Sequence, residues 1–198
     1  MNQSIDDWRG VLAESHRALR TAVAGVGSDA WDKPTPCERW TVAQVFQHAT
    51  GDQHGFASIL TGGPGPDFNP FRPSGVLDGD PAAYLDRVLT DADAAWKTVA
   101  DNAEHVPSPI PGPPQPAWVV AGSAALDAAV HAWDIAVATG RPSPLTPHTA
   151  QQLMLVARLV VDGVREYGAY AAAIATKPGA DEVTVLLAYL GRHADWRP

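Results

Sequence analysis

Hydrophobic positions recur at spacings of three, four and seven residues in five long segments, which is the pattern of helices with one buried face. In the first segment, Trp8, Val11 and Leu12 keep this spacing. Alternation with the period of a strand is confined to a short stretch around residues 182–186. The pattern predicts an all-α protein. Its five long helices and a shorter sixth are expected over residues 5–26, 41–60, 80–100, 118–139, 146–167 and 181–190.

Helix-start signals lie before several of these segments. Thr41 is followed three residues later by Gln44, which has the form of a capping box. Asp80 and Thr146 each stand before a proline, as a cap followed by proline at the first helical position. Residues 4–7 are expected to supply the cap and the acidic first turn of the first helix. Short turns join most segments and favour antiparallel neighbours, so we expect a four-helix bundle with an additional short C-terminal helix.

Composition narrows the class of protein. The chain has 198 residues, of which 45% are hydrophobic, enough for one domain (residues 1–198) with its own core. Its formal net charge of -8 disfavours nucleic acid and anionic membranes as partners. One cysteine allows no intrachain disulfide and no four-thiolate zinc site. The first residues lack the pattern of a signal peptide, and no apolar run reaches the roughly 18 residues of a membrane span. We therefore expect a cytoplasmic protein.

Two polar side chains of the fourth predicted helix have small and apolar neighbours. Asp127 and His131 are four residues apart, so they project from one face, one turn above the other. Burying a carboxylate and an imidazole is costly unless they pair with each other or with an ion. The spacing therefore leaves two readings open, a divalent metal site or a core histidine satisfied by a neighbouring carboxylate.

His48 is a third candidate ligand, because it shares a helix face with the core position Val45. One ligand from one helix and two from a facing helix would build a metal site inside a bundle. Two nitrogens and a carboxylate oxygen suit zinc, nickel or another first-row divalent ion. Three protein ligands would leave at least one coordination position for water or substrate.

Three segments resemble the DinB-like superfamily and, more narrowly, the mycothiol-dependent maleylpyruvate isomerase N-terminal domain group of actinobacteria. Residues 34–42 (PTPCERWTV), with His48 following, resemble the entry to its second helix. Residues 127–142 (DAAVHAWDIAVATGRP) look like its second signature, and residues 186–192 (LLAYLGR) are similar to the close of its short single-domain members. The resemblance covers nearly the whole chain, in the right order.

The resemblance implies a four-helix bundle with a divalent metal, often zinc or nickel, at one end. Its first ligand corresponds to His48, and its later pair corresponds to Asp127 and His131. The isomerase itself is understood to use glutamate at the position of Asp127. It also has a separate C-terminal domain, which we expect this chain to lack.

Three functions are compatible with such a site. The leading hypothesis is a transferase or isomerase that uses a low-molecular-weight thiol such as mycothiol to attack a small electrophile held under the proline-rich loop, residues 103–116. The second is a metal-binding, stress-linked module without catalysis. The third is a metal-dependent hydrolase with Asp52 as its base. The loop at residues 61–79 is the other expected carrier of specificity, and a homodimer is a further expectation.

Other polar residues are interpreted as structural. Cys37 is expected to be a small buried apolar residue, and Asp52 is more simply a surface acid than a further ligand. His54 is expected to face solvent or the long loop. For Asp134 we favour a structural role over a hydrogen bond to an imidazole. Four further histidines have no partner arrangement that singles them out: His16, His105, His148 and His193.

Overall fold

A computed structural model describes residues 4–37 and 39–198. Within these ranges it contains six helices and no strand. Glu38, which belongs to the 34–42 motif, and residues 1–3 lie outside the described part of the chain. The all-α prediction is confirmed, and the stretch around residues 182–186 is helical. The helices are α1 (Trp8–Ala24), α2 (Val42–Thr61), α3 (Pro81–Trp96), α4 (Ala117–Ala138), α5 (Pro147–Arg165) and α6 (Glu182–Tyr189).

Side-chain caps fix where the helices begin. Thr41 and Gln44 form both hydrogen bonds of the capping box at the start of α2. The Asp80 carboxylate accepts from two backbone N–H groups at the start of α3. The expected start of the first helix was too early. The Asp7 carboxylate accepts from the Gly10 N–H at 2.9 Å, and α1 therefore begins at Trp8.

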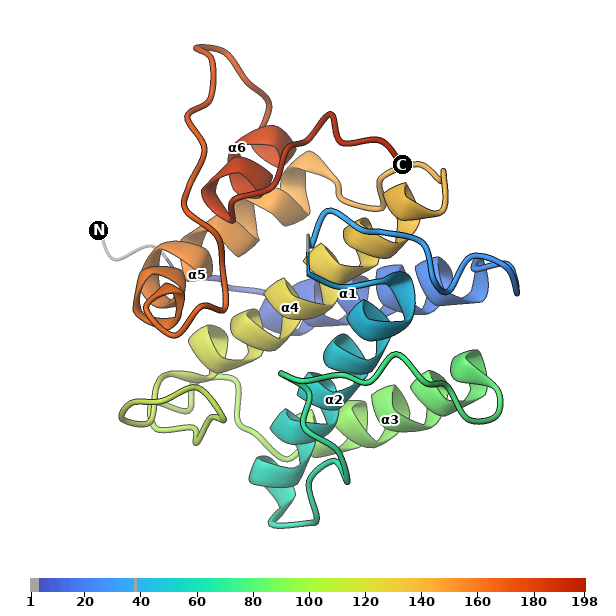
Figure 1. Cartoon of the computed structure of the whole chain (residues 1–198). Helices are drawn as coiled ribbons and strands as arrows, with labels where there is room; N and C mark the ends of the chain where they lie inside the picture. The colour runs from blue at the N-terminus through green and yellow to red at the C-terminus, as the bar shows by residue number, and fades with distance from the viewer. Residues whose placement is uncertain (1–3, 38) are drawn as a thin grey trace.

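The helix α4 runs through the middle of the molecule (Figure 1) and packs against α1, α2 and α5. The helix α3 packs against α2, so that α1 to α4 form the four-helix bundle. The helices α5 and α6 pack on each other at the edge of that bundle. Apart from Trp118 and Val137, every residue of α4 is buried. A polar side chain on this helix is therefore in the protein interior. None of the six helices combines the length and apolarity that crossing a membrane requires.

Small residues on α4 let its neighbours approach closely. A Cβ atom added at Gly122 would clash with a methyl group of Val156, which lies on α5 and is fully buried. Valine has few alternative rotamers, so the clash has no easy relief. In contrast, a Cβ atom at Gly55 of α2 would meet no neighbouring atom within 4 Å.

We expect Gly122→Ala to destabilise the protein although alanine is the better helix former. The gain in helix propensity is about 1 kcal/mol, whereas overpacking a core costs about 1–3 kcal/mol. The matched change Gly55→Ala has only the propensity gain and should stabilise by about 0.5–1 kcal/mol. Urea unfolding of both variants measures the two effects. A stabilised Gly122→Ala protein would contradict close packing of α4 on α5.

Candidate metal centre

Three side chains from two distant stretches of the sequence meet between α2 and α4. The candidate ligand atoms of His48, Asp127 and His131 all lie within 4.8 Å of one another. The three residues are buried, with exposed fractions of 7%, 7% and 6%. The structure thus brings together the ligand set expected from the sequence, at mid-height on the central helix.

The spacing of these atoms fits a small divalent ion. Asp127 Oδ1 lies 3.3 Å from His48 Nε2 and 3.3 Å from His131 Nε2. Tetrahedral coordination at 2.0–2.1 Å places neighbouring ligand atoms roughly 3.3–3.4 Å apart. Both histidine–carboxylate distances match this value, and two imidazole nitrogens with one carboxylate oxygen form a donor set of suitable chemistry for zinc or a similar ion.

Both imidazoles are oriented by a partner on their other nitrogen. The Nδ1–H group of His48 donates to the Pro70 carbonyl oxygen at 3.0 Å, and that of His131 donates to Asp134 Oδ2 at 2.9 Å. With Nδ1 engaged in this way, each ring directs its Nε2 atom at Asp127. Such partners fix the tautomer and ring direction of metal-binding histidines.

The sequence favoured a purely structural role for Asp134. The structure shows that Asp134 also accepts a hydrogen bond from the His131 imidazole. Its fully buried carboxylate also accepts from Arg192 Nε at 2.9 Å and from a terminal nitrogen of Arg192 at 2.8 Å. Burial would raise the pKa of Asp134, but Arg192 and His131 outweigh burial and lower it. Arg192 follows α6, so the C-terminal segment supports His131 through Asp134. Sequence reasoning missed Arg192 because its partner is 58 residues away.

The buried charges polarise the site. Burial would raise the pKa of Asp127, but His131 and His48 outweigh it and keep this carboxylate ionised. Burial would lower the pKa of His131, yet Asp127 and Asp134 raise it to about 9. Burial and the nearby Asp127 raise the pKa of Asp52, one turn beyond His48, to about 7. Asp52 is thus not the freely solvated surface acid expected from the sequence.

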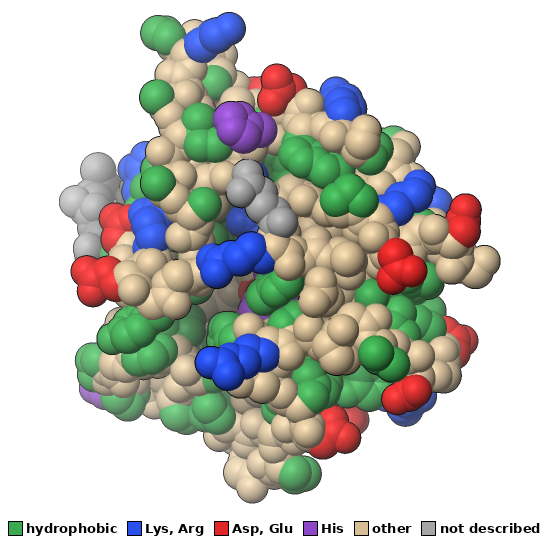
Figure 2. Space-filling view, in the orientation of Figure 1, with side chains coloured by type: hydrophobic (Ala, Val, Ile, Leu, Met, Phe, Trp, Pro, Cys, Tyr) green, Lys and Arg blue, Asp and Glu red, His purple; other side chains and the backbone are tan. Residues whose placement is uncertain are grey.

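Aromatic rings border the site on its open side. The Trp40 ring lies 4.6 Å from the His48 ring, and the Phe71 ring lies 5.4 Å from it. Phe71 is 63% exposed. Figure 2 shows a hollow near the centre of this face, with histidine and acidic atoms in its floor and basic side chains at its border. The long loop that contacts His48 is residues 62–79, through the Pro70 carbonyl oxygen. In the proline-rich loop, residues 103–116, Val106 and Gln115 instead pair with each other in an antiparallel bridge.

The structure also places three other residues. Cys37 is half-buried against the apolar core, as its expected small apolar role requires, and burial together with Asp134 raises the pKa of its thiol to about 11. His54 is half-buried, and its Nδ1 atom is buried. His16 has no exposed surface and hydrogen-bonds through both ring nitrogens, so the expectation that nothing singles it out was wrong.

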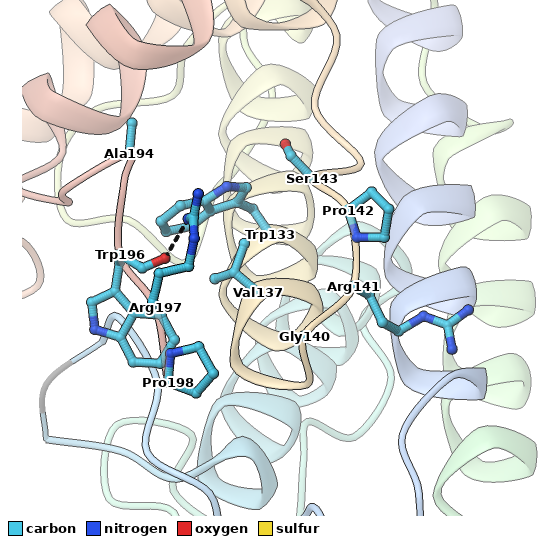
Figure 3. Close-up of a pocket in the computed structure, with 10 residues that line it drawn as sticks. All are labelled: Trp133, Val137, Gly140, Arg141, Pro142, Ser143, Ala194, Trp196, Arg197 and Pro198. Atoms are coloured by element: carbon cyan, nitrogen blue, oxygen red, sulfur yellow. Dashed lines mark hydrogen bonds between the residues drawn. The ribbon is translucent and has the colours of Figure 1, made fainter.

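A separate cavity of about 290 Å³ lies at the C-terminal end of α4. Figure 3 shows Trp133 of α4 and Trp196 of the C-terminal segment on its walls, while Arg141 points away toward α1. None of the three candidate ligands lines it, because Trp133 projects from a different face of α4 than His131. This cavity is therefore distinct from the candidate metal centre.

Comparison with known families agrees with the motifs. The sequence model described as "Mycothiol maleylpyruvate isomerase N-terminal domain" matches residues 12–136. The chain belongs to this family. The matched range contains His48, Asp127 and His131, as well as Asp134, and ends before Arg192. The family resemblance of residues 34–42 and 127–142 is confirmed.

Similar proteins occur in Mycobacterium tuberculosis. The uncharacterized protein Rv0738 of strain H37Rv is 29% identical over 144 residues, which is 73% of this chain and 74% of the relative. The uncharacterized protein Rv0036c is 28% identical over 166 residues, covering 72% of this chain and 59% of the relative. No solved structure matches the chain at a significant level.

The raised pKa of His131 predicts a pH-dependent metal affinity. Below about pH 9 a metal ion must displace the proton that Asp127 and Asp134 favour on this ring. The dissociation constant for Zn²⁺ should therefore fall about tenfold for each pH unit up to about pH 9 and then level off. Competition with a chromophoric chelator across this range measures it. An affinity independent of pH would contradict a protonated His131 in the metal-free protein.

The change Arg192→Met should strongly destabilise the fold. It leaves the Asp134 carboxylate buried without its two guanidinium hydrogen bonds, and losing one partner of a buried ion pair costs about 3–5 kcal/mol. The matched change Arg158→Met alters an exposed arginine and should stay within about 0.5 kcal/mol. Denaturant unfolding compares them, and equal effects would show that the Asp134–Arg192 pair contributes little.

Proposed function

We propose that the protein is a divalent-metal-dependent enzyme that joins a low-molecular-weight thiol, such as mycothiol, to a small electrophile, as a transferase or isomerase. The observation that carries this proposal is the convergence of His48, Asp127 and His131 in a member of this family. When bound there, a zinc or nickel ion would lower the pKa of the incoming thiol and favour its nucleophilic thiolate form.

The residues around the site support a nucleophile that comes from outside the chain. The raised pKa of about 11 keeps Cys37, the chain's single thiol, protonated at neutral pH. Trp40 and the exposed Phe71 offer apolar surface against which a small molecule would pack beside the ligands. His48 and His131 present their Nε2 atoms toward the centre because their Nδ1 atoms are already engaged.

A conjugation assay tests the proposal. Protein loaded with Zn²⁺ or Ni²⁺ should consume mycothiol in the presence of a small unsaturated carbonyl compound, and chelation should abolish the reaction. His131→Ala should lower the rate and the metal content together, by more than the roughly 10–100-fold typical of losing a supporting partner. The exposed His148, changed to Ala, is the control. Equal activity in metal-free protein would rule the proposal out.

The environment of Asp52 favours a hydrolase as the second candidate. A carboxyl group with a pKa of about 7 lies near the operating pH of a general base, and Asp52 stands one turn beyond His48. Hydrolysis of an ester by the metal-loaded protein without any thiol, lost in Asp52→Asn, would favour this function. Metal binding without either activity would leave the non-catalytic binding module as the function.

A further inference from the structure

A chain of hydrogen bonds reaches the carboxylate oxygen of Asp127 that does not contact the histidines. Asp93 Oδ1 lies 2.8 Å from His16 Nδ1, and His16 Nε2 lies 2.9 Å from Gln53 Oε1. The Gln53 Nε2 atom lies 3.0 Å from the Ala124 carbonyl oxygen and 3.5 Å from Asp127 Oδ2. The four linked side chains come from α3, α1, α2 and α4, so the chain joins all four helices of the bundle.

Each bond in this chain has one direction. The Ala124 carbonyl oxygen can only accept, so the amide nitrogen of Gln53 faces it and the amide oxygen faces His16. His16 Nε2 therefore donates to Gln53, and His16 Nδ1 donates to the Asp93 carboxylate. The buried His16 ring is thus hydrogen-bonded at both nitrogens, to Asp93 at one and to Gln53 at the other.

Two acceptors, the Ala124 carbonyl oxygen and Asp127 Oδ2, decide which way the Gln53 amide points. If the amide were turned over, its oxygen would face the Ala124 carbonyl oxygen and Asp127 Oδ2, and its nitrogen would face a donor on His16. Three unfavourable contacts would replace favourable ones. Because His16 and Gln53 are both fully buried, water cannot compensate for these unfavourable contacts.

We propose that Gln53 is a positioning residue for the metal centre, held in place by His16 and Asp93. Its amide N–H group engages Asp127 Oδ2, which leaves Oδ1 directed at the two histidines. The carboxylate would then bind a metal through Oδ1 alone, and the hydrogen bond from Gln53 to Oδ2 would restrict its rotation. This inference rests on the metal site of the proposed function and adds residues outside its three ligands.

Gln53→Met tests the proposal with a side chain of similar length that cannot hydrogen-bond in this way. We expect the dissociation constant for Co²⁺ to rise about 10–100-fold, as is typical when a hydrogen bond to a metal ligand is lost. The visible absorption spectrum of the bound Co²⁺ should also change, because the freed carboxylate alters the coordination geometry. Ser123→Ala is the matched control: it removes a buried polar group of α4 that bonds only to Val119.

Asp93→Asn provides a second variant at a partly exposed position, whose folding is less at risk. It replaces the carboxylate that accepts from His16 Nδ1 by a weaker, neutral acceptor and should weaken Co²⁺ binding by a smaller factor than Gln53→Met, about two- to tenfold, with the same direction of spectral change. A purely structural role would lower the melting temperature of the metal-free variants but leave the Co²⁺ affinity and spectrum unchanged. That result would overturn the proposal. A wild-type protein that binds no Co²⁺, Zn²⁺ or Ni²⁺ would contradict the proposed function as well.

Discussion

The ionised Asp127 carboxylate in the middle of the central helix is the constraint around which the site is arranged. The turns of α4 on either side of it are made of alanine, leucine and valine and are buried against three other helices. A charge in such surroundings is costly unless it is paired and hydrogen-bonded. His48, His131 and Gln53 meet that need from two helices, which is why these polar groups lie together in an otherwise apolar bundle.

The packing of α4 sets the distances within the site. Its small residues allow neighbouring helices to come close, as Gly122 does for Val156 of α5. Ala128 and Ala132 lie in one apolar cluster with residues of α1, α2 and α3, beside the site where His48 lies 3.3 Å from Asp127. Because α2 supplies His48 and α4 supplies Asp127 and His131, the packing of these two helices sets the distances within the ligand set. Larger side chains in this buried cluster would overpack it.

Local patterns in the sequence predicted what local interactions determine. The helices were found because caps such as Thr41 with Gln44 act within three residues, and the Asp127–His131 pair because four residues make one turn. The partner of His16 on α3 is 77 residues away and that of Arg192 is 58 residues away, so no spacing encodes them. Only helix packing brings such residues together.

The shorter carboxylate at position 127 and the buried Gln53 belong together. The isomerase that this chain resembles is understood to use glutamate at this position, whose extra methylene would carry its oxygens farther from the α4 backbone. With aspartate, one oxygen stays 3.5 Å from Gln53 while the other remains 3.3 Å from both histidines. A longer side chain would have to fold back to keep both sets of contacts, at a cost in rotamer energy. Aspartate thus fits a site in which Gln53 holds the second carboxylate oxygen. Through Gln53, the orientation of this ligand depends on the hydrogen bonds that join the four helices.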